Sequence, residues 1–375
     1  MFIKLAARPL WLIVLSFVFS HLIFAQANQY KVGPPKPPSD DTVRVSTEEI
    51  KLNVTVKNDF GHFDPSLQPQ DLMVVEDRTP HTIESLRHVP ASVLIVLDTG
   101  GELRLAKNLK TTRAVAMNLV QSLSDENSLA LMQYSDKAEI LTEWTTDKAQ
   151  ILETLLTKSN FGKRSRFVEA MNLAAKFLEN RPNENRHLVL ITDGTDSMSS
   201  FNERQTAFKK LLAANVSVHI LSYTMLEQKE NAGRSIMVQG GEARAPRRTD
   251  DGHKSTLPQP IQDLMNLPRL GSINTDREML KAAKQRQQDL RNSQKELETL
   301  AKETGGAIFL PVNLDEMPAE AREIAGTIDS QYVLTYIPKR ALADSPAGEV
   351  REIGVVPRRV GIIVEARRKF VVPAK

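Results

Sequence analysis

The sequence contains no cysteine among its 375 residues. This absence excludes disulfide bonds, thiolate nucleophiles, zinc–thiolate sites and iron–sulfur clusters, so ordinary hydrophobic cores must stabilise the fold. An excess of charge of either sign is also lacking, because 49 basic and 46 acidic side chains give a formal net charge of +3. Such a balance provides no electrostatic case for binding nucleic acid or an anionic membrane surface.

A long hydrophobic run occurs only near the N-terminus. Residues 1–27 combine a basic start, an apolar run from Leu10 to Phe24, and small residues at Ala25 and Ala27, the spacing that a signal peptidase recognises. The run is shorter than the ~20 residues that span a bilayer. We therefore expect a signal peptide cleaved at Ala25 or Ala27, with an uncleaved anchor as the alternative. The mature protein would be exported, periplasmic or secreted, without a stable membrane span.

The next segments are distinguished by their residue patterns. Four prolines within residues 31–41 predict an extended linker over 28–41. Alternating apolar and polar residues predict short strands in an N-terminal β segment over 42–90 and a C-terminal β segment over 331–375. Because neither segment is large enough to build a core alone, we expect the two to pair into one small β-sandwich.

Residues 91–330 alternate apolar strands with amphipathic helices. The runs 91–97 and 187–192 are nearly continuous in apolar residues, as expected for strands that helices cover on both faces. Residues 129–144 hold two strands about a short turn, which makes them antiparallel neighbours. The pattern predicts an α/β domain with a doubly wound, mostly parallel sheet. Within it, residues 225–274 lack a sustained period and are expected to form a surface insertion.

Two aspartates stand directly after the most apolar strands. Asp98 follows 91–97, and Asp193 follows 187–192. In an open α/β sheet the carboxyl ends of the strands border the crevice in which ligands bind. If the two strands are neighbours, both carboxylates face one shallow site suited to a hard cation such as magnesium. In the alternative interpretation each aspartate caps the helix that follows it, and spacing alone favours neither.

Several separated motifs, in order, resemble the von Willebrand factor type A family. The resemblance spans residues 43–372 and is strongest to an exported bacterial type with flanking β segments, common in Acidobacteria. It rests on STEEIKLNVTV (46–56), LQPQDLMVVEDRTPHTIESLRH (67–88), VLIVLDTGG (93–101), LALMQYSD (129–136), HLVLITDGTDS (187–197), LAKETGGAIFLP (300–311) and SQYVLTYIP (330–338). The family implies a protein-binding module of the adhesion type that is not an enzyme.

The same family implies a metal-ion-dependent adhesion site, formed by an Asp-x-Ser-x-Ser turn, a threonine and a further aspartate. In this sequence Asp98 and Asp193 match the first and last ligands, Gly100 and Glu102 replace the two serines, and Ser165 falls at the threonine position. The resemblance thus implies a degenerate site in which Asp98, Glu102, Ser165 and Asp193 would hold magnesium. Serines at positions 100 and 102 are expected to restore cation binding. An unidentified protein partner would dock on this crevice, beside the loop 194–201.

Other functions find less support. An alternative from a different class is a structural envelope scaffold whose degenerate site binds neither metal nor ligand. A hydrolase or transferase in the insertion is disfavoured, because nothing there pairs a nucleophile with a base. Residues 161–165 lack the glycine spacing of a phosphate-binding loop. The basic clusters at 358–359 and 367–369 have few aromatic neighbours, which predicts a solvated sheet edge rather than a nucleic-acid site.

Overall fold

The computed structural model describes residues 48–61, 63–101, 107–181, 184–241 and 270–373. All of them belong to one compact unit, Glu48–Lys375. The predicted signal peptide, the linker and the candidate ligand Glu102 lie outside the described residues, as does most of the predicted insertion. Among the helices of the described ranges, none combines the length and the hydrophobicity that a membrane span requires.

A six-stranded sheet forms the centre of the α/β part, in the order β10-β9-β8-β5-β6-β7. Five of its strands run parallel, and β7 is antiparallel to β6. This confirms the predicted doubly wound, mostly parallel sheet and the antiparallel pair over 129–144. The strands are β5 (Ser92–Asp98), β6 (Ser128–Tyr134), β7 (Ala138–Thr145), β8 (Arg186–Thr192), β9 (Ser217–Ser222) and β10 (Ile308–Phe309).

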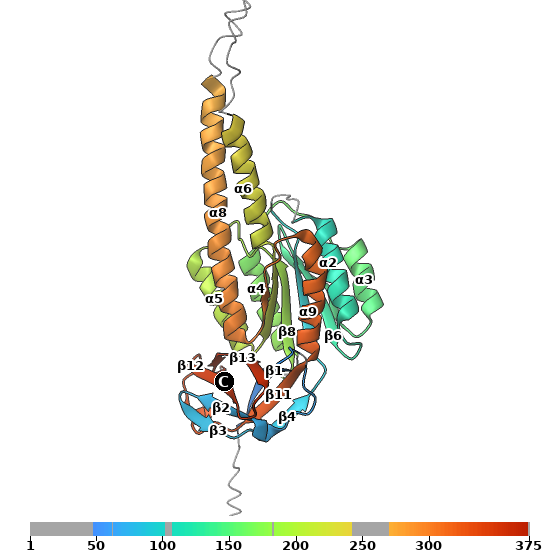
Figure 1. Ribbon diagram of the computed structural model, residues 1–375, viewed down its shortest axis with the longest axis vertical. Helices are drawn as coiled ribbons and strands as arrows, with labels where there is room; N and C mark the ends of the chain where they lie inside the picture. Colours follow the sequence, from blue (N-terminus) through green and yellow to red (C-terminus); the bar gives the residue numbers. More distant parts are fainter. Residues whose placement is uncertain (1–47, 62, 102–106, 182–183, 242–269, 374–375) are drawn as a thin grey trace, which may run out of the picture. The chain divides into compact units, whose positions relative to one another are not determined.

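Helices cover both faces of this sheet (Figure 1). Successive side chains of a strand point to opposite faces, and in β5 residues Val93, Ile95 and Leu97 enter one core while Leu94 and Val96 enter the other. A strand buried on both faces has to be apolar throughout, which is the pattern that the sequence shows. On one face lie α2 (Leu109–Ser122), α3 (Lys148–Thr157) and α9 (Met317–Asp329), and on the other α4 (Phe167–Glu179), α5 (Phe201–Ala213) and α8 (Leu270–Thr304).

A further helix, α6 (Thr224–Gly241), begins where the surface insertion was predicted. It lies along α8, and Gln228 and Asn231 donate hydrogen bonds to Gln294 and to the carbonyl of Ala283. Its buried positions include Thr224, Glu227 and Asn231. These positions follow helical spacing, but their side chains are polar. Leu226 is buried as well, but a single apolar position gives no period, so hydrophobic periodicity did not reveal the helix. Residues 225–241 of the predicted surface insertion are helical.

The flanking segments form two four-stranded antiparallel sheets, in the orders β13-β1-β11-β4 and β14-β12-β2-β3. Each sheet mixes strands from both ends of the chain, and side chains of both sheets share one hydrophobic core. This confirms the predicted sandwich of N- and C-terminal strands. The strands are β1 (Ile50–Asn58), β2 (Leu72–Glu76), β3 (Thr79–His81), β4 (Ser85–His88), β11 (Gln331–Tyr336), β12 (Val350–Pro357), β13 (Ile362–Ala366) and β14 (Lys369–Val371).

The predicted solvated edge is wrong at one position of its second basic cluster. Arg367 is buried, and its guanidinium donates a hydrogen bond to the carbonyl of Leu212 at the end of α5. A long basic side chain can bury its stem while its head finds a hydrogen-bond acceptor. Arg367 thus joins the C-terminal segment to the α/β part.

Candidate functional site

The site begins with the connections that leave the centre of the sheet. The chain passes from β5 through α2 to β6 on one side of β5, and from β8 through α5 to β9 on the other side. Neighbouring connections that depart in opposite directions leave a crevice at the carboxyl ends of their strands. β5 and β8 are adjacent and parallel, with Leu97 opposite Ile191. The condition for Asp98 and Asp193 to meet is therefore fulfilled.

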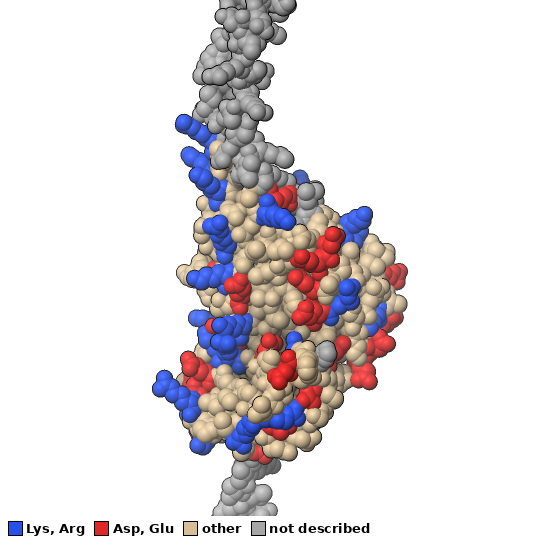
Figure 2. Space-filling view, in the orientation of Figure 1, with Lys and Arg blue, Asp and Glu red and all other residues tan. Residues whose placement is uncertain are grey.

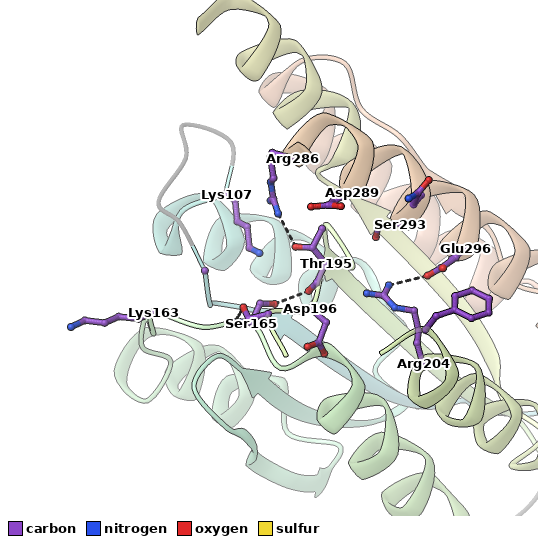
Figure 3. A pocket seen from close by; sticks show the side chains of 14 residues that line it. Lys107, Lys163, Ser165, Thr195, Asp196, Arg204, Arg286, Asp289, Ser293 and Glu296 are labelled. Carbon is purple, nitrogen blue, oxygen red and sulfur yellow. Dashed lines mark hydrogen bonds and ion pairs between the residues drawn. The ribbon is translucent and has the colours of Figure 1, made fainter. Parts of the chain in front are cut away.

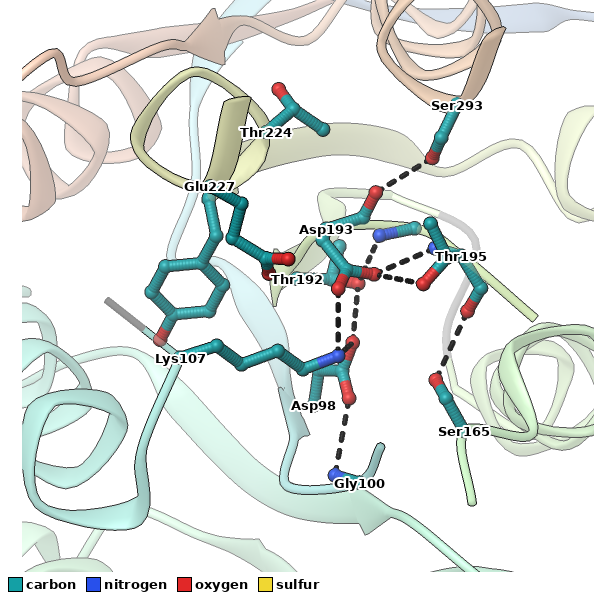
Figure 4. A network of polar contacts seen from close by, with 12 residues as sticks. Asp98, Gly100, Lys107, Ser165, Thr192, Asp193, Thr195, Thr224, Glu227 and Ser293 are labelled. Atoms are coloured by element: carbon teal, nitrogen blue, oxygen red, sulfur yellow. Dashed lines mark hydrogen bonds and ion pairs between the residues drawn. The ribbon is translucent and has the colours of Figure 1, made fainter. Parts of the chain in front are cut away.

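The two aspartates meet at a third residue, Lys107. Its Nζ lies 2.8 Å from Asp98 Oδ2 and 2.8 Å from Asp193 Oδ2 (Figure 4). The lysine side chain is 4% exposed and both aspartate side chains are 0% exposed. Lys107 immediately precedes Asn108, the N-cap residue of α2, whose side chain accepts a hydrogen bond from the Thr111 N–H. The cap thus fixes the backbone from which the ammonium reaches the carboxylates.

Asp98 has hydrogen-bond donors on both oxygens. Gly100 N–H donates to Oδ1 over 3.2 Å, and the Thr192 hydroxyl donates to Oδ2 over 3.0 Å. The phenol oxygen of Tyr134 lies 2.6 Å from Thr192 Oγ1. Because the single hydroxyl proton of Thr192 is directed to Asp98, Tyr134 is the donor in this contact. The carboxylate is thereby joined to the ends of β6 and β8.

Asp193 is saturated with donors. Thr195 donates to Oδ1 through its N–H and its hydroxyl, each over 2.7 Å. Oδ2 accepts from Lys107 and from Arg286 of α8, whose Nη2 lies 2.9 Å away. The same Nη2 lies 2.5 Å from Glu227 Oε2 of α6. Glu227 lies within the predicted insertion and Arg286 lies in the helix that follows it. Both therefore contribute charged groups to the crevice, and no sequence motif pointed to either residue.

Burial and mutual attraction set the protonation of this cluster. Burial acts to raise the pKa of Asp193, but the charges of Lys107 and Arg286 outweigh it and lower that pKa. Burial raises the pKa of Asp98. The charge of Lys107 acts to lower this pKa and the charge of Asp193 acts to raise it, and the net shift is upward. For Lys107, burial is outweighed by Asp193 and Asp98, which raise its pKa. Burial, followed by the charge of Asp193, raises the pKa of Glu227 to about 8. Two permanent cations thus face two aspartates and one easily protonated glutamate.

Ser165, the predicted counterpart of the family's threonine, is also brought to the crevice. Its hydroxyl donates to the carbonyl of Thr195 over 3.0 Å, and its N–H donates to Ser197 Oγ over 3.0 Å. The serine therefore ties its own loop to the loop after β8, and its hydroxyl proton is not available to a carboxylate of the cluster.

Gly100 is required by packing. A Cβ at this position would lie 1.8 Å from the carbonyl oxygen of Arg164 and 2.8 Å from Ser135 Cα. Both are backbone atoms, and real Cβ contacts are not this short. A serine at position 100 therefore cannot supply a ligand here without moving the loop that holds Ser165. The expectation that serines at positions 100 and 102 restore the family's site is not supported by this packing.

The arrangement does not fit a bound magnesium ion. Magnesium needs near-octahedral oxygen ligands at about 2.1 Å, but an ammonium lies between Asp98 and Asp193, and Gly100 offers no side-chain ligand. Across the part of the chain that the structure describes, no group of three or more His, Asp or Glu side chains is placed to hold a metal ion. Because Glu102 lies outside that part, its predicted role as a ligand stays a prediction.

A pocket with a volume of about 440 Å³ opens beside the cluster (Figure 3). Its wall consists of the loop around Ser165, the loop after β8, the start of α5, and α8. Arg204 of α5 and Glu296 of α8 form an ion pair of 3.1 Å across it. Phe201, which lines the pocket, is 65% exposed, and Met198 in the neighbouring loop is 69% exposed. The crevice thus presents polar walls and two solvent-exposed apolar side chains.

Comparison with known proteins agrees with this geometry. Residues 93–195 match the family model of the von Willebrand factor type A domain, so this part of the chain is similar to that domain. Domains of this family are generally binding modules without catalytic activity. No curated protein matches the chain.

Solved structures with similarity to the chain include two bacterial proteins. A von Willebrand factor type A protein from Catenulispora acidiphila is 10% identical, with a TM-score of 0.42, and the match covers 88% of this chain and 75% of that one. The conserved hypothetical protein BatB from Bacteroides thetaiotaomicron is 20% identical, with a TM-score of 0.30 and coverages of 35% and 66%. The chain therefore spans slightly less than two thirds of BatB, and at such identities neither match bears on partners.

Proposed function

We propose that the protein is an exported, adhesion-type module that binds another protein through the crevice at the carboxyl ends of β5 and β8. The observation that carries the proposal is the pocket beside Asp193, which lies at the switch point of the sheet and has Phe201 on its wall. Crevices at this position are the usual ligand sites of open α/β sheets. The von Willebrand factor type A match supports the same conclusion, because domains of this family bind proteins.

The exposed basic face of α8, whose residues lie outside the lining of the pocket, favours a partner with acidic groups. Figure 2 shows Lys and Arg side chains gathered along the side of the molecule where α8 lies. The spacing of these residues places them on one face of the helix, and an acidic partner would be attracted to that face. The exposed basic residues of α8 are Arg277, Lys281, Lys284, Arg291, Lys295 and Lys302.

Export and the degenerate metal site form part of the proposal. The basic and apolar pattern of residues 1–27 supports cleavage of a signal peptide and a periplasmic or secreted location. The replacement of both family serines, by Gly100 and Glu102, supports a degenerate site. The likeness to the acidobacterial exported type rests on the flanking β segments, which pair into one sandwich.

Site-directed photo-crosslinking in the producing cell tests the proposal. A crosslinking amino acid replaces Met198 or Phe201, and a matched control replaces Ile363, an exposed apolar residue of the sandwich. We expect one protein to be captured from the crevice positions and not from position 363. The purified partner should then bind the F201A variant about tenfold more weakly than the wild type, a loss of about 1.4 kcal/mol, and bind the I363A variant unchanged.

The same experiment separates the adhesive function from the scaffold alternative. A structural envelope component whose crevice is inert would give no preferred capture at positions 198 and 201, and its affinity for neighbouring envelope proteins would not respond to F201A. Equal capture from all three positions would contradict the proposed docking surface.

A further inference from the structure

The position of the Lys107 ammonium is the starting point. It bridges a carboxylate oxygen of Asp98 and one of Asp193, the only two family ligands that the sequence keeps unchanged. A shared divalent cation would have to lie between the same two carboxylates. The ammonium therefore stands where the positive charge of an ion would be needed.

The charge around the aspartates is already compensated. Arg286 adds a second cation, 2.9 Å from Asp193 Oδ2. An added divalent ion would meet two positive groups in a site from which water is largely excluded, where charge repulsion is strong. The Lys107 side chain is 4% exposed, so it cannot turn into solvent without a rearrangement of the start of α2. Binding a metal would therefore require this lysine to leave its two partners.

The carboxylate oxygens are also engaged. Asp98 Oδ1 accepts from Gly100, and Asp193 Oδ1 accepts twice from Thr195. Each Oδ2 accepts from Lys107 and from one further donor, Thr192 or Arg286. An ion would have to replace several charge-assisted hydrogen bonds. A serine at position 100 could offer the ion a further ligand, but the packing at Gly100 leaves no room for its side chain.

We propose that Lys107 takes the place of the divalent cation in this crevice, so that the crevice is assembled by an internal ammonium and neither its stability nor its binding of a partner depends on divalent metal ions. The inference deepens the proposed function, because it concerns the same crevice. Its test needs no partner, so that failure of the inference and failure of the proposed function are distinguished.

Thermal unfolding of the full chain tests this inference. Wild-type protein is melted with excess MgCl₂, with excess MnCl₂ and with a chelator. We expect the same melting temperature in all three, whereas an ion at a hundredfold excess over its dissociation constant would raise it by about 5 °C. A rise with either metal that the chelator reverses would overturn the inference, because the ion would then bind in spite of the lysine.

The variant K107A provides the second arm. Removing the ammonium leaves two buried carboxylates facing each other, so we expect a lower melting temperature with chelator and a partial recovery with MnCl₂. The matched control K110A removes an exposed lysine of α2 and should show neither effect. Adding D193N to K107A should abolish the recovery. A folded K107A variant that MnCl₂ does not stabilise would show that Lys107 is not what replaces the ion.

If K107A does not fold, a titration of the wild-type protein with manganese tests the inference instead. We titrate the full chain with MnCl₂ and record the free ion by electron paramagnetic resonance. All added manganese should stay free at protein concentrations suited to the measurement. Loss of about one equivalent of free ion per chain, prevented by the D193N substitution, would overturn the inference.

Discussion

Lys107 donates a hydrogen bond to Asp193 over 2.8 Å, although 86 residues separate them along the chain. The contact exists because two parallel strands end side by side and the side chain of Lys107, just before α2, reaches both strand ends. Asp98 completes the bridge from the end of β5. A buried charge is tolerated when it is paired and hydrogen-bonded, and each of the three groups depends on the other two for that.

The first prediction concerns the coupling between Lys107 and Asp98. The K107M variant leaves an excess of buried negative charge, and breaking a buried pair on one side costs about 3–5 kcal/mol. Adding D98N removes one of those charges while keeping an amide that can bond Thr192. We expect the double variant to be more stable than the sum of the two single changes predicts, by about 2 kcal/mol. Urea unfolding of the four proteins measures this.

A surface pair provides the control for that cycle. Lys148 contacts Asp125 over 2.6 Å, but the aspartate side chain is 92% exposed. Exposed pairs contribute about 1 kcal/mol or less, so the K148M/D125N cycle should show little coupling. Additive effects at Lys107 and Asp98 would contradict the bridged cluster.

The second prediction concerns Gly100. Because its Cβ would collide with the backbone of Arg164, G100S should lower the free energy of unfolding by about 3 kcal/mol, the upper range for overpacking. Gly326 in α9 is the matched control, since a Cβ there meets nothing within 4 Å. G326A should stabilise the helix by about 0.5–1 kcal/mol. Urea unfolding distinguishes the two, and a stable G100S variant would show that the loop at Arg164 yields easily.

The third prediction concerns a buried histidine pair on neighbouring strands. His187 Nδ1 lies 3.1 Å from His219 Nε2, and His187 Nε2 lies 2.7 Å from Asn185 Oδ1. The Asn185 amide nitrogen donates to the carbonyl of Val89, which leaves its oxygen to accept from His187. When both rings are neutral, His187 Nδ1 accepts the hydrogen bond from His219 Nε2. Burial lowers the pKa of His219 to about 3, and burial together with the charge of His219 lowers that of His187.

The sign of the pH dependence follows from these shifts. The unfolded chain takes up protons on both rings below about pH 6.5, but in the folded protein His219 is not protonated until about pH 3, and the pKa of His187 is also lowered well below its ordinary value. Stability should therefore be full above pH 6.5 and fall as the pH decreases, by about 1.4 kcal/mol per pH unit for each histidine. Urea unfolding at a series of pH values should show a shallower slope for the variant H187L/H219L. The control H88Q, which replaces an exposed histidine, should keep the wild-type slope.

The strand pattern predicted the sheet, both halves of the sandwich and the meeting of Asp98 with Asp193. Each of these depends on strands whose buried side chains have to be apolar, and such strands leave a clear pattern in the sequence. Lys107 could not be predicted in this way. It lies outside any strand or helix, and the reach of a long side chain leaves no periodic signal. Glu227 and Arg286 were not predicted as site residues for a related reason. The contacts between α6 and α8 near the cluster are polar, and hydrophobic periodicity gives no information on polar contacts.

The central claim is that a buried ammonium holds the two aspartates together, and the ammonium itself can be observed. In the full chain with isotope-labelled lysine, nuclear magnetic resonance detects side-chain ammonium groups that exchange slowly with water. We predict one such protected signal that K107M removes, K110M keeps and excess MgCl₂ leaves unchanged. A spectrum with no protected signal lost in K107M, or one in which magnesium removes that signal, would contradict the account.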